Sequence, residues 1–155
     1  MSAQSRLAEL GLTLPTPAAA LANYVPAVVS GKLLIVSGQL PFGADGTLSP
    51  AHCGQLGSHV SPEAGRQAAR LCALNILAQV QGAVGSLDAI ARVLKLGAFV
   101  NVAPGFTAIA PVVNGASDLM VEVFGEAGRH ARAAVGVAEL PLGSAVEIDA
   151  MFELV

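Results

Sequence analysis

The sequence predicts an α+β domain in which two helices pack on one face of a mostly antiparallel sheet. Two long segments, 61–84 and 106–124, have the three- and four-residue apolar spacing of amphipathic helices. Other segments are rich in β-branched residues or alternate between apolar and polar side chains, which is typical of strands. The predicted order is two strands, a third short candidate, and then helix, strand, helix, strand, strand. Helices and strands in this order favour the α+β class.

The N-terminal part is predicted to contain a short helix and a hairpin. Residues 3–10 have weak helical periodicity. Two β-branched runs, 24–29 and 32–37, flank Ser30-Gly31 and predict two paired strands.

Turns and then a helix are predicted for the middle of the chain. Residues 41–60 are rich in turn residues, with a candidate short strand at 47–48. The first long helix is predicted to begin after Ser61, a good N-cap residue, with Pro62 at its first position. Its apolar stripe consists of Ala69, Cys72, Ala73, Ile76, Val80 and Ala83. This stripe indicates a helix packed on a sheet.

A strand and a second helix are predicted to follow. Residues 90–102 have the composition of a strand, although Arg92 and Lys95 do not alternate cleanly with the apolar residues. The second helix is predicted within 106–124, with Pro111 near its first turn because proline is tolerated there.

The chain is predicted to end in two strands, 131–138 and 145–154, separated by a Pro141-Leu142-Gly143 turn. One face of the last strand carries Val146, Ile148, Ala150, Phe152 and Leu154. With both helices on one face of the sheet, the other face would be bare. We expect that bare face to meet a second copy of the chain.

Composition supports one domain, 1–155, that associates with itself. The chain has 155 residues, of which 54% are hydrophobic and 12% charged, about half the charge of an average soluble domain. Its longest charge-free stretches, 10–31 and 96–117, are interrupted by prolines, so we predict no membrane-spanning helix. Charges near the N-terminus do not fit a signal peptide, which predicts a cytoplasmic protein.

Several function classes lack support in the sequence. The net charge is −3 with no basic cluster, and there is one Tyr and no Trp, which argues against nucleic-acid binding. Cys53 and Cys72 have no disulfide or metal spacing, and His52 and His59 near Cys53 fit a polar loop better than a zinc site. Signatures of serine hydrolases, nucleotide triphosphatases and dinucleotide enzymes are absent. We therefore expect no metal and no cofactor.

The segment HARAAVGVAELP contains one arginine in an apolar run. In a strand, Arg132 shares its face with Ala134, Gly136 and Ala138, none of which can neutralise its charge. One interpretation is an edge-strand arginine exposed to solvent. Nearby His130 has no visible acidic partner, so it fits an interface or capping residue better than a catalytic base.

Four segments resemble the RidA/YjgF family of reactive-intermediate deaminases, also labelled endoribonuclease L-PSP. The family's opening hairpin is similar to NYVPAVVSGKLLIVSGQLPFGADGTL, and its C-terminal signature to HARAAVGVAELPLGSAVEIDA. GSLDAIARVLKLGAFVNV and PVVNGASDLM are similar to the segments after its first helix and at the start of its second. The resemblance is collinear from about 17 to 154, which leaves 1–16 as an N-terminal extension.

The resemblance implies a chorismate-mutase-like fold, assembled as a homotrimer with small-molecule clefts between subunits. It also implies hydrolysis of reactive enamines and imines, such as 2-aminoacrylate, to a 2-keto acid and ammonia. One alternative is a protein of the same fold that binds a small carboxylate without turnover. The endoribonuclease or translation-inhibitor role of some relatives is less favoured, because an acidic chain lacks the Lys and Arg that neutralise phosphates.

Three catalytic residues follow from the resemblance. Arg132 matches the arginine that grips the substrate carboxylate, which suits the planar two-point donor geometry of guanidinium. Glu147 matches a glutamate near the reactive end of the substrate, where a carboxylate could activate water. Tyr24 matches a tyrosine at the cleft, whose hydroxyl could hydrogen-bond substrate or water. From the residues alone, a solvated strand carboxylate and a packed tyrosine are the alternatives for Glu147 and Tyr24.

Ser37, Gly38 and Asn114 match residues around the substrate. Glycine at 38 would let backbone groups approach a ligand closely. Support of the backbone is the favoured contribution of Asn114. The chain departs from the family at Ala134, where many members carry cysteine, and at His130, where proline is usual. A turn-rich insertion at 43–60 also indicates a divergent, longer subgroup.

Overall fold

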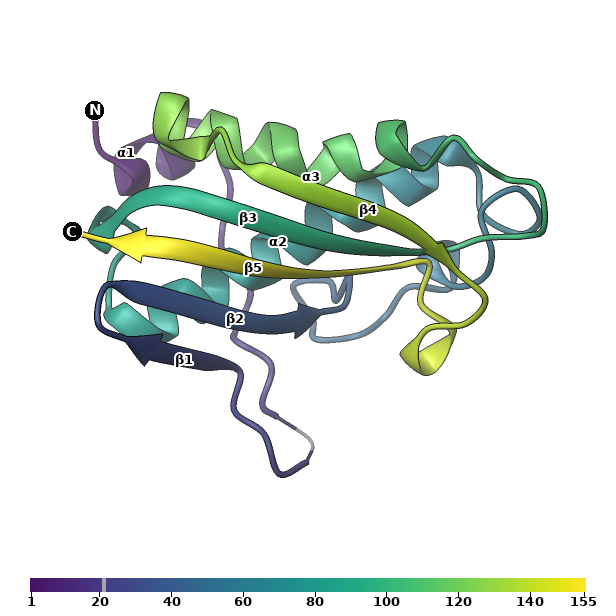
Figure 1. The fold of residues 1–155 in the computed structure, drawn as a ribbon, viewed down its shortest axis with the longest axis horizontal. Coiled ribbons are helices and arrows are strands. Elements are labelled where there is room, and N and C mark those ends of the chain that lie inside the picture. Colours follow the sequence, from purple (N-terminus) through teal and green to yellow (C-terminus); the bar gives the residue numbers. More distant parts are fainter. Residues whose placement is uncertain (21) are drawn as a thin grey trace.

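The computed structural model describes residues 1–20 and 22–155, and it has two layers: a sheet, and helices on one face of that sheet (Figure 1). Its strands are β1 (Ala27–Ser30), β2 (Leu33–Gln39), β3 (Ile90–Asn101), β4 (Ala131–Val137) and β5 (Val146–Leu154). Their order across the sheet is β1-β2-β5-β3-β4. Neighbouring strands are antiparallel except β3 and β4, which are parallel. The predicted α+β class is confirmed.

The helices are α1 (Ala3–Glu9), α2 (Pro62–Val84) and α3 (Ile109–Phe124). As predicted, Ser61 caps α2: its side-chain oxygen accepts a hydrogen bond from the backbone N–H of Ala64. Pro111 lies in the first turn of α3, where a missing N–H costs no helical hydrogen bond.

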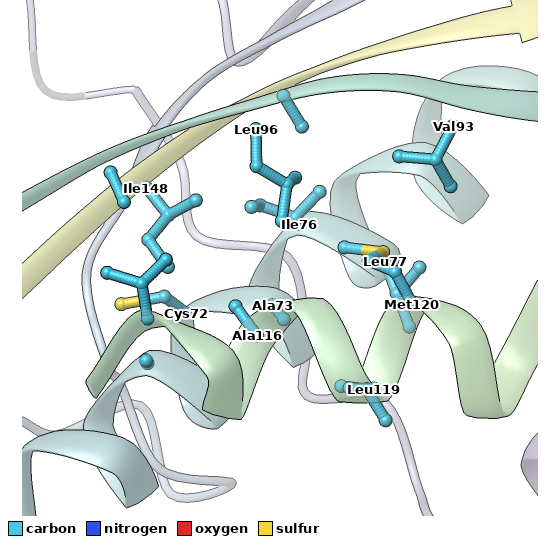
Figure 2. Packing of buried hydrophobic residues seen from close by; sticks show 14 of the residues in the cluster. Cys72, Ala73, Ile76, Leu77, Val93, Leu96, Ala116, Leu119, Met120 and Ile148 are labelled. Atoms are coloured by element: carbon cyan, nitrogen blue, oxygen red, sulfur yellow. The ribbon is translucent and has the colours of Figure 1, made fainter. Parts of the chain in front are cut away.

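The core lies between the sheet and the helices α2 and α3. In Figure 2, Cys72 and Ile76 of α2 point toward Ile148 of β5 and Leu96 of β3. All four side chains are fully buried. Most of the stripe predicted for the first long helix is therefore buried, but Ala83, near the end of α2, is exposed, so its place in the stripe is wrong. The opposite sheet face is not covered by helices (Figure 1).

The structure differs from the predicted strand at 47–48 and explains the uneven pattern of β3. The candidate strand at 47–48 is wrong, because only a single bridge joins Phe42 and Leu48 among turns. The uneven alternation of Arg92 and Lys95 results from register shifts in the β3–β5 pairing. An extra residue in one strand interrupts the two-residue period on which alternation depends.

Close contact between α2 and α3 depends on Gly115. A Cβ atom at this position would overlap the backbone carbonyl of Arg66 on α2. We predict that Gly115→Ala forces the helices apart and lowers the free energy of unfolding by about 1–3 kcal/mol, measured by urea denaturation.

Gly82→Ala is the matched control, because Gly82 also lies within a helix but a Cβ there would meet Pro17 at an ordinary 3.6 Å. Helix propensity predicts that this control is neutral or stabilising. An equal loss of stability in both variants would refute the close-contact explanation.

Candidate functional site

Three of the predicted site residues line one pocket of about 230 Å³. Tyr24 contributes from the segment before β1, Gly38 from β2 and Glu147 from β5. The remaining wall is mostly apolar, and includes residues 18–20 and the Pro141-Leu142 turn. The pocket therefore surrounds a carboxylate and a phenol with apolar surface.

A β-bulge in β2 shapes this pocket. Val36 pairs with Ala150 and Gln39 pairs with Ile148, so one extra residue of β2 is accommodated between these two pairs. A Cβ atom at Gly38 would overlap the carboxylate of Glu147. The space beside Gly38 is therefore taken up by the Glu147 side chain, and the approach of a ligand to the backbone at Gly38 stays a prediction.

The residues beside Gly38 hold the backbone around the pocket. Ser37 donates from its hydroxyl to the Val25 carbonyl over 2.8 Å, so its side chain anchors the segment before β1. Gln39 is buried and donates to the Ser37 carbonyl over 3.0 Å. Buried Gln79 donates to Gln39 and to the Ala18 carbonyl. These bonds attach the 18–20 segment to the pocket wall.

Burial raises the pKa of Glu147, and the negative charge of Asp149 raises it further. Burial also raises the pKa of Asp149. Glu147 therefore holds a proton more readily than an exposed glutamate does. A carboxylate tuned in this direction is suited to accept a proton and return it.

The raised pKa predicts that Glu147→Gln is more stable than the wild type at pH 7. The pKa of Glu147 is higher in the folded than in the unfolded protein, so its proton stabilises the fold at pH values below the unfolded pKa. This stabilisation is lost as pH rises through the folded pKa, whereas glutamine is neutral at every pH. We expect a gain under about 1 kcal/mol, because solvent screens the half-exposed carboxylate. Urea unfolding at pH 7 and pH 4 would measure it.

Glu153→Gln, at an exposed position of the same strand, controls for the loss of one negative charge. If Glu147→Gln raised the free energy of unfolding by the same amount at pH 4 as at pH 7, the raised pKa of Glu147 would not be the cause.

Arg132 lies on the other face of the sheet, against α3. Its Nη1 donates to Asn114 Oδ1 over 2.9 Å and to Ser117 Oγ over 3.1 Å. The side chain is partly buried, so the solvent-exposed interpretation is wrong. Among the residues that the structure describes, no carboxylate pairs with Arg132, and its Nε and Nη2 make no hydrogen bond. This free edge has the geometry for two-point binding of a carboxylate.

The sheet separates Arg132 from Glu147 within one protomer. Arg132 pairs with buried Leu96 and faces the helices, whereas Glu147 alternates with buried Val146 and Ile148 and faces away from them. Strand β3 lies between their strands. Five of the predicted site residues thus form two groups: Tyr24, Gly38 and Glu147 in the pocket, and Asn114 with Arg132 on the helical side. The sixth, Ser37, does not line the pocket, because its hydroxyl bonds to the Val25 carbonyl.

The face that carries Glu147 has exposed apolar side chains. Val28, Ile35, Val135 and Met151 are between 37% and 48% exposed. Ile35 pairs with both Val28 and Met151, so these three form a continuous stripe across β1, β2 and β5. An apolar stripe on an uncovered sheet face is typical of an interaction surface.

Comparison with known proteins identifies the family of this chain. The family described as "YjgF/chorismate_mutase-like, putative endoribonuclease" matches residues 4–154. The chain belongs to the YjgF/RidA family. The chorismate-mutase-like fold expected from the resemblance is therefore confirmed.

Three relatives show how this YjgF/RidA chain compares with others. Protein TCP17 of Trypanosoma cruzi is 52% identical over 97% of this chain and 92% of its own. A crystal structure of a protein of unknown function from Agrobacterium tumefaciens is 50% identical, covers 99% of this chain and 92% of its own, and has a TM-score of 0.90. RidA from an Antarctic Psychrobacter is 27% identical, covers 90% and 94% of the two chains, and has a TM-score of 0.64.

In this YjgF/RidA chain, Ser117 and His130 form a chain of contacts to Arg132 that was not predicted from the sequence. Ser117 accepts from Arg132, and His130 lies 2.9 Å from the Ser117 hydroxyl. The three-residue spacing of Asn114 and Ser117 was the available signal, because such residues share one face of a helix. His130 also contacts the Gly128 carbonyl at the end of the preceding turn, which agrees with the capping alternative.

Residues 1–20 and 22–155 contain no group of three or more His, Cys, Asp or Glu side chains placed to hold a metal ion. Within the same residues, no helix is long and apolar enough to span a membrane.

Proposed function

We propose that this protein hydrolyses reactive 2-enamino and 2-imino acids to 2-keto acids and ammonia, in a cleft between the subunits of a homotrimer. The observation that carries the proposal is the free edge of Arg132. A partly buried guanidinium, held by α3 and without a carboxylate partner among the described residues, is available for the carboxylate of a small substrate.

The proposed reaction adds water across the C=N bond of the 2-imino acid. Glu147 removes a proton from water as the oxygen attacks the imine carbon, and it passes that proton to the imine nitrogen. Glu147 then removes the hydroxyl proton of the resulting carbinolamine and delivers it to the nitrogen, so the C–N bond breaks, the keto group forms and ammonia leaves. The raised pKa of Glu147 and its mostly apolar surroundings support this role. The hydroxyl of Tyr24, at the same pocket, would orient the water or substrate.

A second copy of the chain is required to complete the site. Arg132 and Glu147 face opposite sides of their own sheet, so one substrate reaches both only if they come from different subunits. The apolar stripe of Val28, Ile35 and Met151 offers a surface for that contact. A closed ring repeats one such contact at every interface.

Mixed oligomers test this arrangement. We expect Arg132→Ala and Glu147→Gln to be inactive separately and to regain activity when coexpressed with different affinity tags and purified through both. Purification through both tags removes the homotrimers. Each mixed cyclic trimer then has both donated residues native in one of its three clefts, which predicts about a third of wild-type activity. The assay follows keto-acid release from freshly generated 2-iminopropionate.

The other outcomes separate the alternatives. No activity in the mixed oligomer, with an active wild type, would refute the shared cleft. Saturable binding of a 2-keto acid without any turnover by the wild type would instead select a carboxylate-binding protein. RNA cleavage that survives stringent purification and Arg132→Ala would favour the endoribonuclease role.

A further inference from the structure

We propose that Ser117 and His130 are positioning residues that hold Arg132 in its carboxylate-binding orientation. Their contribution to turnover rests on the proposed function, but the orientation of Arg132 can be measured without any reaction. The inference starts from a short chain of polar contacts that runs from Gly128 through His130 and Ser117 to Arg132.

The direction of each hydrogen bond in this chain follows from chemistry. The Gly128 carbonyl can only accept, so Nδ1 of His130, 2.6 Å away, carries a hydrogen and donates to it. In a neutral imidazole the other nitrogen is then an acceptor, and the Ser117 hydroxyl donates to His130 Nε2 over 2.9 Å. The lone pairs of Ser117 Oγ are left to accept from Arg132 Nη1.

The neutral state of His130 fits its surroundings. Burial lowers the pKa of His130, and the positive charge of Arg132 lowers it further, although the contact with Gly128 acts in the opposite direction. A neutral ring keeps Nε2 available as an acceptor. The tautomer therefore fixes the rotation of the Ser117 hydroxyl, and that rotation points the oxygen lone pairs toward the arginine.

This chain determines which edge of the guanidinium remains free. Nη1 carries two hydrogens, and both are used, one by Asn114 and one by Ser117. Nε and Nη2 remain for a ligand. An unrestrained arginine loses side-chain entropy when it becomes ordered. The acceptors on α3 order part of the side chain before a ligand binds, so less entropy is lost on binding. Ser117 and His130 thus prepare a two-point donor for a carboxylate.

A nucleophilic role for Ser117 is the competing interpretation, because a serine hydroxyl next to a histidine resembles the start of a catalytic triad. Arg132 lies on the same oxygen, and the 230 Å³ pocket does not include Ser117. The geometry therefore favours a structural hydroxyl over an attacking one. Reaction of Ser117 with a fluorophosphonate probe would overturn the positioning role.

The test compares Ser117→Ala, Ser117→Thr and His130→Phe in the full-length protein. We expect Ser117→Ala to raise the KM for 2-iminopropionate and the Kd for pyruvate by about tenfold, with kcat within about twofold, because carboxylate binding is equal in ground and transition states. Ser117→Thr keeps the hydroxyl and should restore both values. His130→Phe should act in the same direction as Ser117→Ala.

A double variant and a spectroscopic signal make the test independent of the reaction. Ser117→Ala/His130→Phe should bind pyruvate no more weakly than Ser117→Ala alone, since both remove one chain of contacts. Separate Nη resonances of Arg132 should be seen by NMR in the wild type and should merge in Ser117→Ala. Additive effects, or unchanged Nη resonances and Kd, would refute the inference. A wild type without deaminase activity but with these signals would refute only the proposed function.

Discussion

Arg132→Ala should abolish detectable binding of 2-keto acids and reduce kcat/KM by about 30-fold to several thousand-fold, because loss of a charged hydrogen-bonded partner costs about 2–5 kcal/mol. The guanidinium edge that remains free after Asn114 and Ser117 are satisfied would be lost. Calorimetry with pyruvate and initial rates with 2-iminopropionate would measure the two effects.

Two controls separate carboxylate recognition from general damage. Arg132→Lys keeps the charge but lacks the planar fork, so it should recover little of the lost affinity. Arg66→Ala removes an arginine of α2 from an exposed ion pair with Asp118 of α3, and it should leave binding unchanged. If Arg132→Ala bound pyruvate as tightly as the wild type does, Arg132 would not be the residue that binds the carboxylate.

Glu147→Gln should lower kcat by about 100-fold to 10,000-fold, the usual contribution of a general acid–base group. Glutamine has almost the same shape but cannot take a proton from water. The KM should change little, because the carboxylate of the substrate is held by Arg132. Single-turnover kinetics on freshly generated 2-iminopropionate would isolate the chemical step.

The neighbouring carboxylate provides the matched control for this rate effect. Asp149 lies on the same face of β5, and a Cβ at Gly97 would overlap its carboxylate, as one at Gly38 would overlap that of Glu147. It does not line the pocket, so Asp149→Asn should retain most of the rate. If both variants lost the same amount of kcat, the negative charge of this sheet face would explain the effect, and Glu147 would not act as a specific base.

Local physics explains why most elements could be predicted from the sequence. The start of α2 depends on Ser61 and Pro62, which act within one helical turn. The strand identity of β5 depends on alternation between adjacent residues. The wrong strand at 47–48 came from the same kind of reasoning, because a two-residue stretch lacks enough neighbours to define a period.

Residue types at the site were also accessible from the sequence, but their grouping was not. The resemblance pointed to Tyr24, Gly38 and Glu147, and these line one pocket. It also pointed to Arg132 and Asn114, which are in contact with each other. The separation of these two groups by the sheet depends on strand order, and strand order is decided by pairings between distant segments.

The α+β class, the helix starts, the strand patterns and the family follow from the order of amino acids alone, because each depends on neighbouring residues or on a collinear pattern. The parallel pairing of β4 with β3 at the sheet edge and the acceptors that α3 supplies to Arg132 appear only in the folded chain. A side chain's direction is set locally, whereas its partners are set by which distant elements pack against it.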